Sequence, residues 1–136
     1  MADVSVKWTG GGQFLASDEA GHVVVTDRDG QGMKPPNLLL ISLATCAGID
    51  VVSILEKKRQ RFTSIEARVS KQNDPDPPWC IEKIELEWVV RGRGLKEKAV
   101  RDAVRLAEEK YCSVSATVRG VAQITTEYEI VTPDAA

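Results

Sequence analysis

The sequence predicts an α+β fold with mostly antiparallel pairing, in the order βββ-α-ββ-α-β. Two observations support this class: apolar and polar residues alternate with period two in several short stretches, and two longer stretches have helical character. The 136 residues fit one hydrophobic core, and 43% apolar with 28% charged residues is typical of a soluble globular protein. We therefore expect a single domain over residues 1–136.

The N-terminal strands are expected within residues 4–27. Val4, Val6 and Trp8 alternate with polar residues, and glycines 10–12 then form a turn or bulge. Residues 13–16 resume an extended segment, and HVVVTD at residues 22–27 supplies the third strand. This pattern predicts a three-stranded antiparallel meander. The next segment, 27–36, holds two glycines and two prolines, which end the extended structure.

A long helix is expected at about 36–58. Between Leu38 and Leu55 the polar side chains are Ser42, Thr45, Asp50 and Ser53. A membrane span is disfavoured, since the run is about 27 Å long, short of a ~30 Å hydrocarbon core, and Asp50 would cost about 2.5–3.5 kcal/mol there. A buried central helix is favoured instead. A chain this small cannot easily enclose such a helix, so we expect a homodimer in which two copies pack together.

The second half alternates again. A strand pair is expected at about 62–91, interrupted by the proline-rich loop NDPDPP at 73–78. Residues 95–110 form an amphipathic helix, with apolar residues on one face and charges opposite. A last strand is expected at about 121–131.

Composition also limits the function. A net charge of -2 gives no electrostatic attraction for nucleic acid, so we expect no nucleic-acid partner. The N-terminus MADVSVKWTGGG shows no secretory signal, so we expect a cytoplasmic protein without a membrane partner. Three dispersed cysteines and one histidine, His22, lack the spacing of a zinc site. TGGG at 9–12 is not followed by the Gly-Lys-Ser/Thr of a phosphate-binding loop. No metal or cofactor is expected.

The cysteines are the candidate reactive groups. Cys46 lies in the middle of the apolar helix and Cys112 follows the amphipathic helix directly, whereas Cys80 stands at the start of a strand in no recognisable motif. Free cysteines are often small buried hydrophobes, and no C-x-x-C spacing brings Cys46 and Cys112 together. Packing and redox roles therefore both stay open from chemistry alone.

Four features add to this reading: PPNLLLISLATCAGIDVVSILEKKRQ, the later YCSVSATV, the opening VKWTGGGQF, and the strand order. Together they resemble the OsmC/Ohr family, specifically its OsmC-like branch, over nearly the whole chain. The resemblance implies an intertwined homodimer whose β-sheets wrap two central helices. It also implies that Cys46 attacks a hydroperoxide and becomes a sulfenic acid, and that Cys112 resolves it to a disulfide. A dithiol such as a lipoylated protein would then reduce that disulfide.

The chain departs from the family pattern at two positions. Gln13 stands in the glycine-rich strand where family peroxidases have a thiolate-stabilising arginine, and Asn37 follows Pro36 where a glutamate is common. Without a cation, we expect Cys46 to keep the ordinary pKa of a free thiol, roughly 8.5, or a higher one. Asp50, one helical turn after Cys46, would oppose thiolate formation, or act as a base or as an anchor for a cation.

Two arginines are candidates for that missing cation. Arg28 lies in the loop before the long helix, and Arg119 follows the second cysteine motif. Either would act on Cys46, within one subunit or across the dimer.

Two functions follow. The first is a thiol-dependent reductase of organic hydroperoxides or hydrogen peroxide, with Cys46 attacking and Cys112 resolving. The second is a non-peroxidase dimer that acts as a redox sensor or small-molecule binding module, which the missing arginine and glutamate favour.

Overall fold

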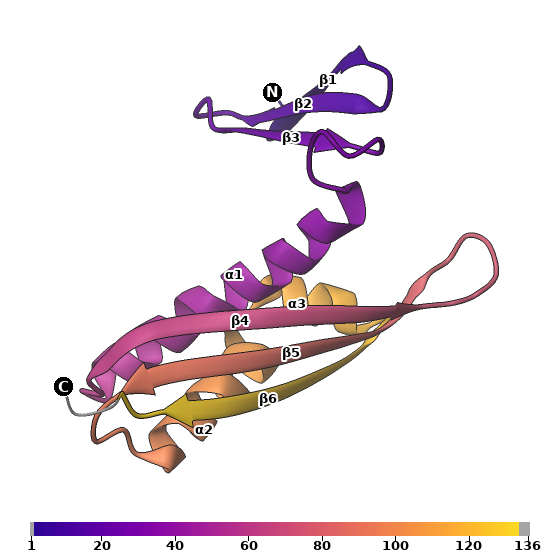
Figure 1. Ribbon diagram of the computed structural model, residues 1–136. Helices are drawn as coiled ribbons and strands as arrows, with labels where there is room; N and C mark the ends of the chain where they lie inside the picture. Colours follow the sequence, from indigo (N-terminus) through magenta and orange to yellow (C-terminus); the bar gives the residue numbers. More distant parts are fainter. Residues whose placement is uncertain (1, 134–136) are drawn as a thin grey trace. The chain divides into compact units, whose positions relative to one another are not determined.

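The computed structural model describes residues 2–133 and confirms the α+β fold (Figure 1). The N-terminal elements are β1 (Val4–Gly10), β2 (Gln13–Asp18), β3 (Val23–Asp27) and α1 (Pro35–Lys57). They are followed by β4 (Phe62–Asn73), β5 (Ile81–Gly92), α2 (Glu97–Leu106), the π-helical turn η1 (Ala107–Tyr111), α3 (Ser113–Arg119) and β6 (Gln123–Val131). The chain divides into two compact units, one up to Leu40 and the other from Ile41.

The first unit is built on the sheet β1-β2-β3, and its pairing is antiparallel throughout, as predicted for residues 4–27. Gly10 and Gly11 have φ values of 121° and 55°, which L side chains rarely adopt, so glycine permits the tight turn between β1 and β2. After β3 the chain folds back on itself, because Asp27 N donates to Met33 O at 3.0 Å and Met33 N donates to Val25 O at 3.2 Å.

The second unit is built on the sheet β4-β5-β6. β4 and β5 form the expected antiparallel hairpin, but β6 runs parallel to β5, from the pair Lys83–Gln123 to the pair Arg91–Val131. The expectation of antiparallel sheets is therefore wrong for β6. The cause is the connection: α2, η1 and α3 return the chain to the end of the sheet where β5 began, which is the geometry of a parallel crossover.

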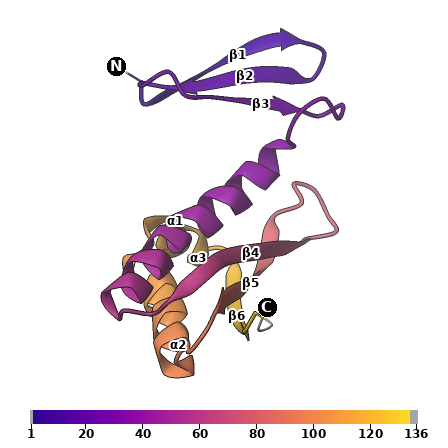
Figure 2. The same ribbon diagram turned by 60° about the vertical axis from the view of Figure 1, so that its left-hand side comes forward.

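The core of the second unit lies between this sheet and the helices, which cover one of its faces (Figure 2). On α1 the buried side chains recur every four residues, so one stripe faces the sheet. Across from it, Trp88 lies close to the helix, since a Cβ added at Gly48 would come within 3.4 Å of the indole ring. The buried side chains of this core are Leu43, Ala47, Val51 and Leu55 on α1, Ile84, Leu86, Trp88 and Val90 on β5, and Ala99, Val100, Ala103 and Val104 on α2.

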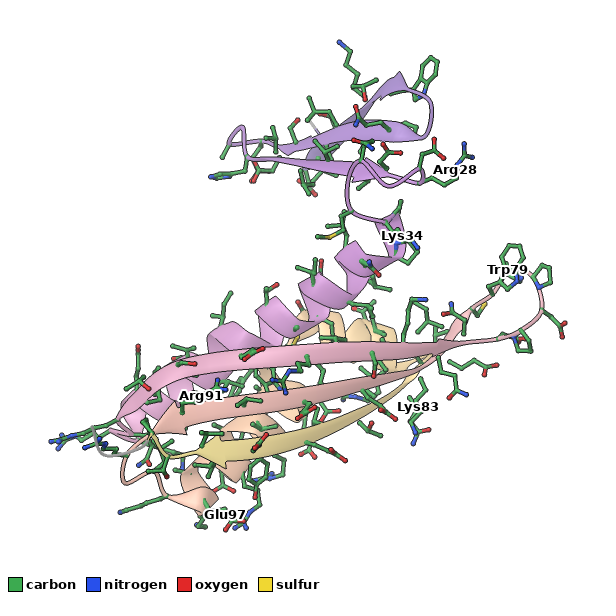
Figure 3. All side chains as sticks on the ribbon, in the orientation of Figure 1. Arg28, Lys34, Trp79, Lys83, Arg91 and Glu97 are labelled. Atoms are coloured by element: carbon green, nitrogen blue, oxygen red, sulfur yellow. The ribbon has the colours of Figure 1, made fainter. Side chains whose placement is uncertain are left out.

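The opposite face of the sheet carries charged side chains. Figure 3 shows Lys83 and Arg91 projecting from β5, and each forms an ion pair: Lys83 with Glu85 at 3.2 Å and Arg91 with Glu66 at 3.6 Å. Outward-facing Glu85 alternates with buried Ile84 and Leu86, so β5 has the two-sided pattern of a half-buried strand.

The predicted helix at 95–110 is interrupted in the structure. α2 ends at Leu106, a π-helical turn covers the next five residues, and the short helix α3 follows Cys112. α3 was not predicted, because its seven residues, SVSATVR, carry no apolar period and include β-branched residues that favour helices weakly.

α1 matches the predicted bounds within one residue at each end. It is the one helix in residues 2–133 long and apolar enough to cross a membrane by length and composition, a test that core helices of soluble proteins also pass. Some of its other apolar side chains are exposed: Leu39 and Ile41 are each 40% exposed and Ile49 is 71% exposed. α1 therefore presents apolar side chains on the face turned away from the sheet of the second unit.

Candidate functional site

Cys46 occupies the middle of α1 in the second unit, beside the stripe that packs on the sheet. Its neighbour Ala47 is buried, while Cys46 itself is half-buried. The helix is anchored on both sides of the cysteine by Leu43 and Val51, which are fully buried. The thiol therefore sits at a fixed position at the edge of the core.

Cys112 lies at the junction between the π-helical turn and α3. Its backbone is extended, with φ −89° and ψ 112°, and its Sγ accepts a hydrogen bond from Ser115 N at 3.3 Å. Cys112 is thus the N-cap of α3, a position where a side-chain acceptor satisfies an otherwise unpaired amide. On its other side, Cys112 N donates to Ala107 O at 3.1 Å, which closes the π-helical turn. Such turns interrupt regular helices and are frequent at functional sites.

The structure brings the two cysteines together. The side chain of Cys112, the backbone N–H groups of Val114 and Ser113, and the Ser113 hydroxyl lie near enough to the Cys46 sulfur to act on its pKa. Every group in this cluster belongs to the second unit. The start of α3 therefore surrounds the Cys46 sulfur with donors.

These contacts lower the pKa of the Cys46 thiol below its ordinary value. The side chain of Cys112 contributes most, followed by the N–H of Val114, and partial burial opposes them. Donors aimed at a sulfur stabilise its thiolate form, since the charged form gains more from each hydrogen bond than the neutral thiol does. The expectation of an unshifted or raised pKa, drawn from the missing arginine, is wrong, because it left out the amides of a helix that was not foreseen.

The other predicted residues lie as follows. Asp50 is half-buried on α1, one turn after Cys46. Arg119 is exposed, and its Nη2 donates to Glu108 O at 2.5 Å, which ties the end of α3 to the π-helical turn. Arg28 belongs to the first unit, where its side chain is 79% exposed and pairs with Asp29 at 3.4 Å.

Sequence reasoning missed Ser113 and Ser115. Ser115 is fully buried, its N–H binds Cys112 Sγ, and its hydroxyl has no hydrogen-bond partner among residues 2–133. The available signal was the run CSVS itself, in which an N-cap residue is followed by small polar residues. Read as the start of a helix, this run would have placed amides beside Cys112.

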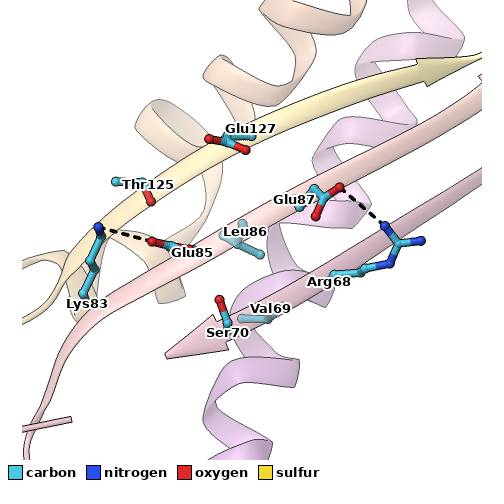
Figure 4. Close-up of a pocket in the computed structure, with 9 residues that line it drawn as sticks. All are labelled: Arg68, Val69, Ser70, Lys83, Glu85, Leu86, Glu87, Thr125 and Glu127. Atoms are coloured by element: carbon cyan, nitrogen blue, oxygen red, sulfur yellow. Dashed lines mark hydrogen bonds and ion pairs between the residues drawn. The ribbon is translucent and has the colours of Figure 1, made fainter. Parts of the chain in front are cut away.

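The outward face of the sheet holds a separate shallow pocket of about 460 Å³ (Figure 4). Its lining is mostly charged and already paired, with Arg68 Nη1 at 3.4 Å from Glu87 Oε1 and Lys83 Nζ at 3.2 Å from Glu85 Oε1. Neither Cys46 nor Cys112 lines it. The pocket therefore contains neither candidate thiol, and the cysteine pair is the candidate site.

No group of three or more His, Cys, Asp or Glu side chains within residues 2–133 is placed to hold a metal ion. The reactive chemistry that the described residues offer is that of the two thiols.

Fold and site together define an α+β domain that carries a paired-cysteine centre on its helical layer. The family model described as OsmC-like protein matches residues 28–127, and the chain belongs to this family. The resemblance to the OsmC/Ohr family read from the sequence is thereby confirmed. Membership supports a redox or peroxide-stress role.

Individual relatives agree with this assignment. The chain is 37% identical over 128 residues to Protein YhfA of Escherichia coli K12, which covers 93% of this chain and 96% of that protein. A hypothetical protein from Aquifex aeolicus, known by crystal structure, has 31% identity and a TM-score of 0.89 over 98% of both chains. The organic hydroperoxide resistance protein OhrB of Bacillus subtilis has 20% identity and a TM-score of 0.64, over 95% of this chain and 98% of that one, a likeness of fold.

Proposed function

We propose that this protein is a dithiol-dependent hydroperoxide reductase that protects the cytoplasm against organic hydroperoxides or hydrogen peroxide. One observation carries the proposal: Cys112 and the start of α3 lie close enough to Cys46 to lower the pKa of its thiol, and the Cys112 side chain contributes most. A nucleophilic thiolate with a second thiol beside it is the arrangement that peroxide reduction through a disulfide requires.

In the first step the Cys46 thiolate attacks one peroxide oxygen. The S–O bond forms as the O–O bond breaks, and the other oxygen leaves as an alkoxide, or as hydroxide for hydrogen peroxide, which takes up a proton. Cys46 is oxidised to the sulfenic acid and the peroxide is reduced to an alcohol or water. The N–H groups of Ser113 and Val114 hold the thiolate before attack.

In the second step Cys112 attacks the Cys46 sulfenic acid. The S–S bond forms, the S–O bond breaks, and the hydroxyl leaves as water with the proton of the Cys112 thiol. Cys112 lies in the same cluster as Cys46, where its side chain acts on the Cys46 thiol, which supports its role as the resolving group. An external dithiol, such as a lipoylated protein, then reduces the disulfide and is itself oxidised.

We also propose that the protein is an intertwined homodimer in which sheets wrap two α1 helices. The apolar face of α1 that stays open in one chain, with Ile49 71% exposed, supports a second copy as its cover. In the first unit, Val4, Val6 and Trp8 are each more than 60% exposed and need cover too. A monomeric mass by light scattering would contradict the dimer.

A second function is favoured by the residues that replace the family arginine and glutamate. Gln13 lies in β2 and accepts a hydrogen bond from Thr9 Oγ1 at 3.0 Å through its Oε1, and Asn37 lies in the first turn of α1. Neither can supply a fixed charge. A dimer that forms the disulfide as a redox sensor, or that binds a small molecule without turning over peroxide, would fit this composition.

Turnover of cumene hydroperoxide and of hydrogen peroxide with dihydrolipoamide tests the proposal. The wild type should turn over, Cys46→Ser should not, and Cys112→Ser should stop at the sulfenic acid, which dimedone traps. Cys80→Ser is the matched control, because Cys80 is exposed and lies outside the cluster, and it should keep full turnover. Turnover without Cys46 would end the peroxidase proposal. A single oxidation to the disulfide without turnover would favour the sensor.

A further inference from the structure

Nine exposed cations of the second unit lie on the segment where α1 ends, on the turn before α2 and along α2 itself. We call this surface the basic end; it comprises Lys57, Lys58, Arg59, Arg61, Arg93, Lys96, Lys98, Arg101 and Arg105. The two turns that carry it lie side by side, since Lys96 N donates to Gln60 Oε1 at 2.9 Å and Phe62 pairs with Gly92.

The basic end is strongly positive, although the net charge of the whole chain is slightly negative. Its segments contain three acidic residues, Glu56, Glu97 and Asp102, against nine basic ones. The rest of residues 41–133 carries eleven acidic side chains against six basic ones. The net charge of -2 therefore conceals a strongly cationic end on a unit that is otherwise acidic.

Asp102 holds part of this surface in a fixed arrangement. Its carboxylate lies 4.0 Å from Lys58 Nζ, 3.9 Å from Lys98 Nζ and 3.6 Å from Arg105 Nη2, and its side chain is only 19% exposed. One carboxylate neutralises a single charge of the three cations around it. The cations therefore keep a net positive field, and they are held across two elements rather than free to spread.

We infer that the basic end docks an acidic surface of a partner protein. Charge complementarity steers such an encounter and fixes its orientation. Acidic residues lie among the cations, such as Glu97 at the start of α2 (Figure 3), so a partner surface that also carries some basic residues can bind in a single orientation. The inference goes beyond the proposed peroxide chemistry and does not depend on it.

Two other polyanions fit less well. A nucleic acid longer than the basic end would run onto the acidic remainder of the unit, and segments 56–61 and 93–105 contain no aromatic residue on which bases could stack. A membrane surface would call for exposed apolar side chains beside the cations, but Ala99, Val100, Ala103 and Val104 are buried in the core.

Fluorescence anisotropy with a short labelled poly-glutamate peptide tests the inference on the full chain. The wild type should bind the peptide in low salt, and binding should weaken about tenfold or more between ~0.05 and ~0.3 M NaCl, because added salt screens exposed charges. The triple variant Lys57→Glu, Arg59→Glu, Arg61→Glu should lose about tenfold or more in affinity. It spares the cations that contact Asp102, and its fold is checked by its melting temperature.

A second triple variant is the matched control. Lys71→Glu, Lys83→Glu and Lys110→Glu change the net charge equally but lie outside the basic end, and this variant should keep most of the peptide affinity. Equal losses in both variants would overturn the inference, since net charge would then explain binding. Tighter binding of a duplex DNA, or of phosphatidylglycerol vesicles, than of the peptide would overturn it too, as would no peptide binding by the wild type.

Discussion

Replacing Ser113 by alanine should slow the reaction of Cys46 with an alkylating agent at neutral pH. The Ser113 hydroxyl is one of the donors that lower the Cys46 pKa. Removing it leaves fewer donors for the thiolate, so the pKa of Cys46 rises and a smaller fraction of the thiol is ionised.

The expected change in alkylation rate follows from the net free energy that one hydrogen bond contributes. A net contribution of about 0.5–1.5 kcal/mol suits this donor, because Ser113 is itself exposed and water competes for its hydroxyl. Since about 1.4 kcal/mol corresponds to a factor of ten, alkylation at a pH below the pKa should slow about two- to tenfold. Well above the pKa both proteins are fully ionised, and their rates should converge.

Iodoacetamide alkylation, followed by mass spectrometry of the peptide that carries Cys46, measures this rate from pH 5 to 10. The Cys80→Ser background removes the exposed competing thiol. Ser113→Thr keeps the hydroxyl and should stay close to the wild type. Thr117→Ala removes a hydroxyl of the same helix that binds Ser113 O at 2.9 Å, and it controls for loosening of α3.

Two results would refute the reasoning. Superimposed pH profiles for Ser113→Ala and its parent would show that the hydroxyl does not act on the thiolate. A rate lowered by one factor at every pH, with an unchanged midpoint, would show that access to the sulfur had changed instead of its ionisation.

Three further predictions concern the reduced protein. Because the Cys46 pKa is lowered in the folded protein, the difference in unfolding free energy between wild type and Cys46→Ser should be constant below that lowered pKa. The difference should then grow as the pH rises toward the pKa of the unfolded thiol, roughly 8.5. Urea unfolding at a series of pH values measures this difference, and a difference that falls with pH would contradict the prediction. Gly92→Ala should lose about 2 kcal/mol or more of unfolding free energy, because the new Cβ would clash with Arg61 O and lie 2.9 Å from Phe62 Cα. Gly120→Ala is the control: the nearest atom to its Cβ would be Thr117 O at 3.6 Å, so the unfolding free energy should change little. Ile49→Glu should shift the light-scattering mass toward the monomer, since it places a charge on the open face of α1, and an unchanged mass would show that this face lies outside the interface.

Most of the fold was readable from periodicity. The meander at 4–27, the helix at 36–58 and the strand pair at 62–91 all appear within a few residues of their expected bounds, because each has a clear pattern or run of apolar residues in the sequence. The direction of β6 was not readable, since alternation specifies which side chains face the core but not which end of the sheet the chain enters.

The site was readable only in part. Cys46 and Cys112 came from the resemblance, and the structure supplies their contact. The groups that act on Cys46 are the Cys112 side chain, two backbone N–H groups and the Ser113 hydroxyl, and their positions depend on α3. A helix of seven residues is too short for its sequence pattern to predict it. A cationic side chain was therefore the wrong kind of group to expect beside Cys46.

The contact between Cys46 and Cys112 also links redox state to folding. The two residues are far apart in the chain, one on α1 and one after α2, so a disulfide between them would close a long loop and constrain the unfolded chain by about 4 kcal/mol. By thermodynamic linkage the fold would favour the disulfide by the same amount relative to the unfolded chain. Oxidised protein should therefore melt at a higher temperature than reduced protein. Its reductant must be correspondingly strong, which suits a dithiol that closes its own ring on oxidation better than it suits a monothiol.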